Sequence, residues 1–331
     1  MNMKHKSRQS AILLSVCIVA AAAVLMLVFG LIEYLVDKTE NIPAEGVLSS
    51  EKSSEGTLYY NNNWYVPEES LETLLVLGID KRLDGSEDRA DSEQVDFLAL
   101  LIIDNEEECF RILHLNRDTM TEIPILDAAG IVKGTFLGQL ALAHAYGSHD
   151  GSRCRNTVRA VENLLYGTEI DHYLSLTMDA VAIMNDSIGG VAVTLPVDME
   201  SLGKAGDVVT LTGEQALYYV RERGGLEDSS NLQRMERQQQ YIGELFAAFS
   251  KAAEDNTENT FEILLHINEY MVSDYTVEQL STLIEKLDGY TYDGILTLAG
   301  EAVQGNEYME FRIDETAVRQ TVVDLFYTPC E

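Results

Sequence analysis

Basic residues are scarce in this chain. Its 331 residues include 23 lysines and arginines against 55 aspartates and glutamates, and the formal net charge is -32. Proteins that bind nucleic acids through the phosphate backbone need a basic surface that attracts it. The strong acidity therefore disfavours a nucleic-acid partner. It also makes any local group of arginines a candidate for a specific role.

Cysteine is also scarce, and the spacing of the four cysteines fits no metal-binding motif. Cys17 lies in an apolar segment, which leaves Cys109, Cys154 and Cys330 for the rest of the chain. Three cysteines do not make a disulfide framework. Cys109 and Cys154 can form one bridge in an oxidising compartment or remain unpaired thiols, and the sequence leaves both alternatives open.

Charge is absent from residues 11–32, a run long enough to cross a bilayer as a helix. We expect a retained anchor rather than a cleaved signal peptide, because the run is long and no clear small-x-small cleavage site follows it. Lys4, Lys6 and Arg8 precede the run without any acid, which predicts a cytoplasmic tail over residues 1–10. Everything from about Glu33 onward is then outside the membrane, away from the chromosome.

Residues 33–66 are rich in Glu, Ser and Asn and show little apolar periodicity, which is typical of an extended stalk. We expect the folded domain to begin near Pro67. Its main part would cover residues 67–250, and residues 251–331 would complete it.

Three apolar runs predict buried strands covered on both faces: Leu74–Ile79, Phe97–Ile103 and Ile112–Leu115. Asp80 directly follows the first run, and Arg117 and Asp118 follow the third. Ligand sites in layered α/β folds form at such strand ends.

Helical patterns follow over residues 156–166, 178–188, 212–220 and 234–251, with a strand at 191–195. Thr212 and Gln215 fit a capping box at the start of the third helix. The tail from about residue 256 adds two helical patterns and a strand-like segment at Gly294–Leu298. Strands that alternate with helices indicate an α/β or α+β sandwich.

Arginines recur in short polar phrases at these element ends: Arg117, Arg221 with Arg223, and Arg234 with Arg237. A guanidinium group matches phosphate oxygens in a bidentate way, so the phrases suggest a phosphate or pyrophosphate site. Arg234 and Gln238 are spaced to reach one ligand together. The alternatives are a structural Arg–Asp pair at Arg117, helix-end charges at 221 and 223, and a solvated helix face at 234 and 237.

Asp80 and Asp96 are candidate magnesium ligands, because magnesium prefers oxygen and takes one or two carboxylates together with substrate phosphates. The alternative is that both are solvated acids, of which this chain has many.

Taken in order, these phrases resemble the LytR–CpsA–Psr family, whose members are bacterial envelope ligases with one anchor and an external catalytic domain. The resemblance covers roughly residues 72–250. It is carried by the phrases LLVLGIDKR, QVDFLALLIID, LNRDT, QLALAHAYG, TGEQALYYVRER and RMERQQQ.

The resemblance implies a central mixed sheet flanked by helices, with an apolar pocket for a polyprenyl chain. It implies transfer of a glycopolymer (wall teichoic acid, capsule or another wall polysaccharide) from undecaprenyl diphosphate to a sugar hydroxyl of peptidoglycan. Asp80 and Asp96 would hold magnesium against the diphosphate. Asp118 would position or deprotonate the acceptor, or only orient Arg117. The head group would be lined by Arg82, Arg117, Arg221, Arg223, Arg234 and Gln238.

The chain departs from the family pattern at Gln94, Gln139 and Asn231, and the loop between Asp80 and Asp96 is longer than usual. We expect core or rim roles for His144 and Tyr146. Two other functions use the same features: hydrolysis of polyprenyl diphosphates by water, and lipid binding by a non-catalytic envelope regulator.

Overall fold

The computed structural model describes residues 57–79, 94–127, 129–222, 267–306 and 308–330, with scattered positions between 233 and 248. The predicted tail and apolar span, and most of the predicted stalk, lie outside these residues. Within the described ranges, no helix is both long and apolar enough to cross a membrane.

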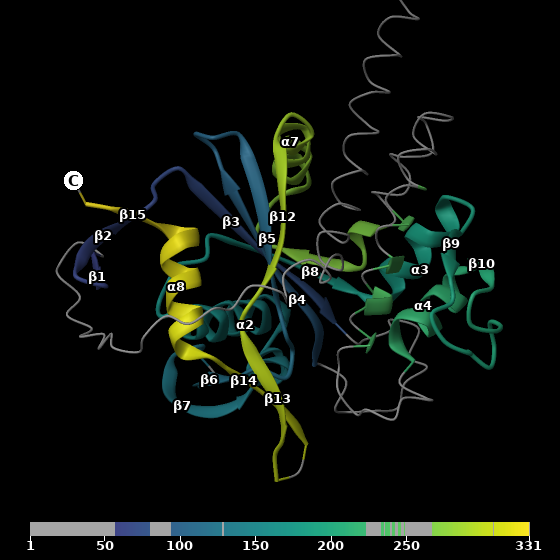
Figure 1. Cartoon of the computed structure of the whole chain (residues 1–331), viewed down its shortest axis with the longest axis horizontal. Helices are drawn as coiled ribbons and strands as arrows, with labels where there is room; N and C mark the ends of the chain where they lie inside the picture. Colours follow the sequence, from purple (N-terminus) through teal and green to yellow (C-terminus); the bar gives the residue numbers. More distant parts are fainter. Residues whose placement is uncertain are drawn as a thin grey trace, which may run out of the picture.

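A six-stranded mixed sheet forms the centre of the fold (Figure 1). Its strand order is β11-β8-β3-β4-β5-β12. Strand β4 pairs antiparallel with both β3 and β5, whereas β3–β8 and β5–β12 are parallel pairs. The strands are β3 Leu71–Ile79, β4 Val95–Asp104, β5 Cys109–Leu115, β8 His172–Thr177, β11 Met271–Ser273 and β12 Thr291–Thr297.

Helices cover both faces of this sheet, which is why its central strands are continuously apolar. Side chains of β3 alternate between two hydrophobic clusters, with Leu74 and Val76 in one and Leu75 and Leu77 in the other. The first cluster includes α3 Met178–Ser187, α4 Gly213–Arg221, α7 Val277–Asp288 and helical residues between 233 and 248. The second includes the 3-10 helix η1 Leu140–Tyr146, α2 Asp150–Leu164 and α8 Glu315–Phe326.

Smaller sheets surround this sandwich. One joins β1 Leu58–Tyr60, β2 Asn63–Pro67 and β15 Tyr327–Pro329. Three antiparallel pairs are β6 Met120–Leu126 with β7 Val132–Gln139, β9 Val191–Thr194 with β10 Val208–Leu211, and β13 Gly300–Gln304 with β14 Met309–Ile313. Strands β1 and β2 precede Pro67, so the folded domain begins earlier than predicted, because residues 58–67 pair with each other and with the chain end.

Helix boundaries agree with the sequence where capping residues mark them. The capping box of α4 is confirmed: the Thr212 amide donates to Gln215 Oε1 at 3.0 Å. In contrast, α2 begins six residues before the predicted start at 156, where His149 Nδ1 accepts a hydrogen bond from the Ser152 amide at 3.3 Å. Its first turn is polar and so has no apolar periodicity.

Both Cys109 and Cys154 are free thiols.

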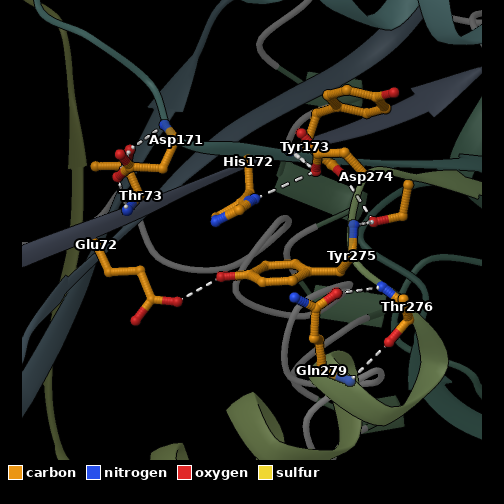
Figure 2. A network of polar contacts seen from close by, with 10 residues as sticks. Glu72, Thr73, Asp171, His172, Tyr173, Asp274, Tyr275, Thr276 and Gln279 are labelled. Carbon is orange, nitrogen blue, oxygen red and sulfur yellow. Dashed lines mark hydrogen bonds and ion pairs between the residues drawn. The ribbon is translucent and has the colours of Figure 1, made fainter.

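A polar network fastens the amino ends of the parallel strands β3 and β8, at the edge opposite the arginine phrases (Figure 2). Asp171 accepts hydrogen bonds from the amide and the hydroxyl of Thr73, each 2.8 Å long. Glu72 accepts from Tyr275, and Lys286 Nζ lies 2.5 Å from its carboxylate. Burial alone would raise the pKa of Glu72, but these donors lower it. The network ties the start of α7 to the sheet.

His114, on β5, gives the fold a predicted sensitivity to acid. Burial lowers the pKa of this histidine from 6.5 to about 4, and its ring stacks on Phe97. Above pH 6.5 it is neutral in both the folded and unfolded chain. Between pH 6.5 and 4 only the unfolded chain takes up the proton, so we expect the stability to fall by about 3 kcal/mol over that window and the effect to level off below it.

Urea denaturation of the wild type and of His114→Phe, at several pH values from 7 to 4, measures this effect. The difference between the two proteins isolates His114 from the many carboxylates. Parallel stability curves for the two proteins would contradict the prediction.

Candidate functional site

The turn after β5 sets the position of Arg117 and Asp118. The Asp118 amide donates to Asn116 Oδ1, and the Thr119 amide donates to the Asn116 carbonyl, each at 3.0 Å. These bonds fold residues 116–119 tightly against the sheet edge, where β3, β5 and β8 end and β4 begins. Arg117 is buried there, with 8 % of its surface exposed.

Three side chains surround the Arg117 guanidinium. Its Nη1 forms an ion pair with Asp96 Oδ1, its Nη2 donates to Gln94 Oε1 at 2.8 Å, and its Nε lies 3.5 Å from Asp118 Oδ1. Asp96 is itself buried, at the start of β4. The Arg117 fork is therefore held in one orientation before any ligand arrives.

Arg234 approaches the same carboxylate. It lies in a helical segment on the face of the sheet that holds the first hydrophobic cluster. Its Nη1 lies 3.6 Å from Asp96 Oδ1, and the side chain is only 3 % exposed. Arg237 is equally buried and donates to the carbonyls of Tyr219 and Glu222 at the end of α4. The alternative of a solvated helix face at Arg234 and Arg237 is therefore wrong: one contacts Asp96, and the other binds a helix terminus.

Asp118 is fixed by residues from two other elements. Gln139 Nε2, at the end of β7, donates to Asp118 Oδ1 at 3.1 Å and to the Met309 carbonyl at 2.8 Å. The Phe311 amide of β14 donates to the Asp118 carbonyl at 2.8 Å. Strand β14 thus supports the Arg117–Asp118 turn from outside residues 72–250, where the family resemblance was found.

An apolar pocket lies beside this cluster, on the α3 and α4 face of the sheet. It encloses about 540 Å³ of empty space, part of it open to solvent, and its walls come from β3, β4, β8, α3, α4 and the residues near 240. Gly78 forms part of one wall, and an added Cβ there would lie 2.9 Å from Phe97 Cβ. Gln238 also lines it and donates to the Val220 carbonyl at 3.1 Å. Its lining is apolar apart from Thr177 and Gln238.

The structure brings together four of the predicted site residues: Asp96, Arg117, Asp118 and Arg234. Gln238 lines the neighbouring pocket, and Arg221 lies partly buried in the last turn of α4. The other predicted ligands, Asp80, Arg82 and Arg223, lie outside the described residues.

Two residues of the cluster were noted in the sequence only as departures from the family pattern, Gln94 and Gln139. Each bonds directly to Arg117 or Asp118. Each is the first residue of a phrase that resembles the family and lies at or next to the end of a strand, and this position is the sequence feature that could have identified it.

The described residues do not by themselves supply enough ligands for a magnesium site. No group of three or more His, Cys, Asp or Glu side chains is placed to hold a metal within the described ranges. Asp96 offers carboxylate oxygen, the donor that magnesium prefers, but two guanidinium groups already approach its Oδ1. Of the predicted pair, Asp96 has its Oδ1 approached by the two arginines, and Asp80 is outside the described residues.

Curated proteins with similar sequences include two teichoic acid–peptidoglycan teichoic acid transferases. The chain is 32% identical over 174 residues to the polyisoprenyl-teichoic acid–peptidoglycan teichoic acid transferase TagU of Halalkalibacterium halodurans, a match that covers 51% of this chain and only half of that relative. It is 26% identical to the corresponding transferase TagV of Bacillus subtilis, over 93% of this chain and 78% of the relative.

Solved structures share the fold. The crystal structure of Bacillus subtilis TagV aligns with a TM-score of 0.58 at 23% identity, covering 78% of this chain and 97% of that one. A structure described as TagT bound to LI-WTA aligns with a TM-score of 0.54 at 21% identity, covering 78% of this chain and 90% of that one. The model of the LytR_cpsA_psr family matches residues 39–325, most of the sequence. The chain is a member of the LytR–CpsA–Psr family.

Proposed function

We propose that this protein transfers a glycopolymer from a polyprenyl diphosphate to peptidoglycan. The observation that carries the proposal is the buried Asp96–Arg117–Arg234 cluster beside a pocket with an apolar lining. A donor with an apolar chain and a diphosphate head group has the two parts that such a site accommodates. The relatives are teichoic acid–peptidoglycan teichoic acid transferases, which supports the same reaction.

In the proposed reaction, an acceptor sugar hydroxyl attacks the phosphorus that carries the glycan. A new oxygen–phosphorus bond forms, the bond to the lipid phosphate breaks, and polyprenyl monophosphate leaves. The hydroxyl proton passes to solvent. Arg117 and Arg234 stabilise the charge that develops on the phosphate oxygens, because a fixed donor costs no reorganisation during the reaction. Asp118 orients Arg117, since its Oδ1 is engaged by Arg117 and Gln139.

The remaining predicted ligands belong to the proposal as well. Arg82, Arg221 and Arg223 would add guanidinium groups around the diphosphate, and Gln238 would lie where the head group meets the chain. Asp96 with Asp80 would hold magnesium, which neutralises phosphate charge when bound. The membrane anchor at residues 11–32 would keep the domain at the outer surface, where the lipid donor is found. A reporter fused to the C-terminus tests that topology: activity on the cytoplasmic side would contradict it.

The reaction is tested with the full chain in detergent, a polyprenyl-diphosphate-linked glycan, isolated peptidoglycan and magnesium. We expect wall-linked glycan and polyprenyl monophosphate in equal amounts. We also expect chelation of magnesium to abolish transfer and its re-addition to restore it. Free phosphorylated glycan without a wall-linked product would instead support the hydrolase. Donor binding without any product would support a lipid-binding protein.

A further inference from the structure

A second pocket, polar in character, lies on the other face of the central sheet. It encloses about 520 Å³ of empty space, part of it open to solvent. We call it the polar pocket. The polar side chains that line it are His144, Asp150, Arg153, Ser175, Thr177 and Glu269. They come from η1, the first turn of α2, the end of β8 and the residues just before β11. The proposed reaction above does not use them.

Three connections place the polar pocket at the same sheet edge as the arginine cluster. Ile79, in its wall, is paired with Val95, the residue before Asp96. The helix η1, which carries His144, starts beside the site, because the Ala141 amide donates to the Arg117 carbonyl at 2.9 Å. Thr177 lines both the polar and the apolar pocket. The two pockets therefore flank one edge from opposite faces, with η1 and α2 on one side and α3 and α4 on the other. Figure 1 shows α2 on one side of the sheet and α3 and α4 on the other.

The charge of the polar pocket disfavours phosphate. Arg153 forms an ion pair with Asp150 at 3.1 Å, which leaves the Glu269 carboxylate as the excess charge of the lining. Anions are repelled by such a lining, whereas a neutral ligand rich in hydroxyl groups is not. Thr177 Oγ1 is buried and has no hydrogen-bond partner among the described residues. A buried hydroxyl of this kind gains from a ligand that supplies the missing hydrogen bond.

The cysteine in this pocket does not make it a second catalytic centre. Cys154 Sγ lies 3.9 Å from His144 Nε2, an arrangement that superficially matches a nucleophile and a base. Burial raises the pKa of Cys154 to about 12, however, so the sulfur remains a protonated thiol at neutral pH. A thiol is a poor nucleophile compared with a thiolate. The pocket is therefore suited to binding rather than to covalent chemistry.

We propose that the polar pocket binds a sugar of the acceptor glycan, an inference that rests on the proposed function. In phosphoryl transfer the attacking and leaving oxygens lie roughly in line on opposite sides of the phosphorus. If the polyprenyl phosphate leaves toward the apolar pocket on one face of the sheet, the acceptor hydroxyl arrives from the other face. The polar pocket lies on that face, and its polar lining without excess positive charge suits a neutral sugar. The new oxygen–phosphorus bond then joins the acceptor held there to the transferred phosphate.

A double variant, Ser175→Ala with Glu269→Gln, tests the assignment at two residues that line the polar pocket and not the apolar one. We expect its KM for soluble, uncrosslinked peptidoglycan strands to rise at least about tenfold, the effect of one or two lost hydrogen bonds. Its KM for the lipid-linked donor and its kcat at saturating acceptor should stay within about twofold of wild type.

Asp150→Asn gives a matched comparison with Glu315→Gln, since both acids form ion pairs with an arginine in the first turns of a helix, and only Asp150 lines the polar pocket. Only the Asp150 variant should weaken acceptor binding.

Direct binding separates this inference from the proposed function. Isothermal titration of the full chain with the same strands, without donor, should show binding to wild type that the double variant weakens at least about tenfold. That result supports the pocket even if wild type performs no transfer. Unchanged acceptor binding and KM in the double variant would overturn the inference. A rise in donor KM alone would overturn it as well, because the pocket would then serve the donor.

Discussion

Replacing Arg117 with alanine is expected to lower the rate of glycan transfer by about a hundredfold to a thousandfold, the usual effect of removing one fixed donor from a developing oxyanion. Arg117 is the centre of the cluster, in contact with Gln94, Asp96 and Asp118. The loss should fall mainly on kcat, since the fork contributes most when charge develops on the phosphate. Steady-state transfer with the lipid-linked donor measures it.

The same strand supplies a matched control. Arg111 also lies on β5, but its guanidinium is partly exposed and pairs with Asp293 at 3.1 Å, on the far end of the strand from the site. Arg111→Ala should transfer at nearly the wild-type rate. Arg117→Lys keeps the charge without the fork, and we expect it to remain at least about tenfold impaired. Full activity of Arg117→Ala in a folded protein would show that the site is elsewhere.

Replacing Asp96 with alanine is expected to reduce the free energy of unfolding by about 3–5 kcal/mol, because it leaves two buried guanidinium groups without their shared carboxylate. The side chains of Asp96, Arg117 and Arg234 are 6 %, 9 % and 3 % exposed, so water cannot take over the role of the carboxylate. Urea denaturation of the wild type and the variant measures the difference.

Asp293 provides the exposed counterpart of this test. It pairs with Arg111 at 3.1 Å and is 39 % exposed, so Asp293→Ala should cost only about 0–1 kcal/mol. A double-mutant cycle between Asp96→Ala and Arg117→Met isolates the pair from other effects. Equal losses for the Asp96 and Asp293 variants would contradict the buried cluster.

The central strands were predictable because burial on both faces leaves an unbroken apolar run. The runs at 74–79, 97–103 and 112–115 are the cores of β3, β4 and β5, and the segment at 294–298 overlaps β12. The order β11-β8-β3-β4-β5-β12 was not predictable, because apolar runs do not specify their neighbours.

The peripheral hairpins were missed for a related physical reason. Strand β6 is only partly buried and includes Pro124, and β7 is exposed over most of its length and mixes lysine, threonine and glycine with its apolar residues. Their pairing depends on the neighbouring strand more than on their own apolar content. The start of the domain was misplaced similarly, since β2 pairs with β15 near the other end of the sequence.

At the site, residue types were predictable and contacts were not. Strand-end and helix-end positions identified Arg117 and Arg234 as candidates, but only the fold shows that both approach Asp96. Residues 251–331 were expected to complete the domain, but no local pattern indicated that they support the site, where Met309 and Phe311 hold Gln139 and Asp118. Contacts between distant segments leave no local signal in the sequence.

The pairing of β2 with β15 has a structural consequence. The Cys330 amide donates to the Trp64 carbonyl at 2.8 Å, and Tyr327 and Thr328 pair with Pro67 and Val66. Helix α8 runs directly into β15, so this ladder also joins β2 to the helix that covers the second hydrophobic cluster. Residues 65–67 are thus tied to the far end of the sequence before the chain enters the central sheet at β3, so the entry to that sheet depends on both ends of the described domain.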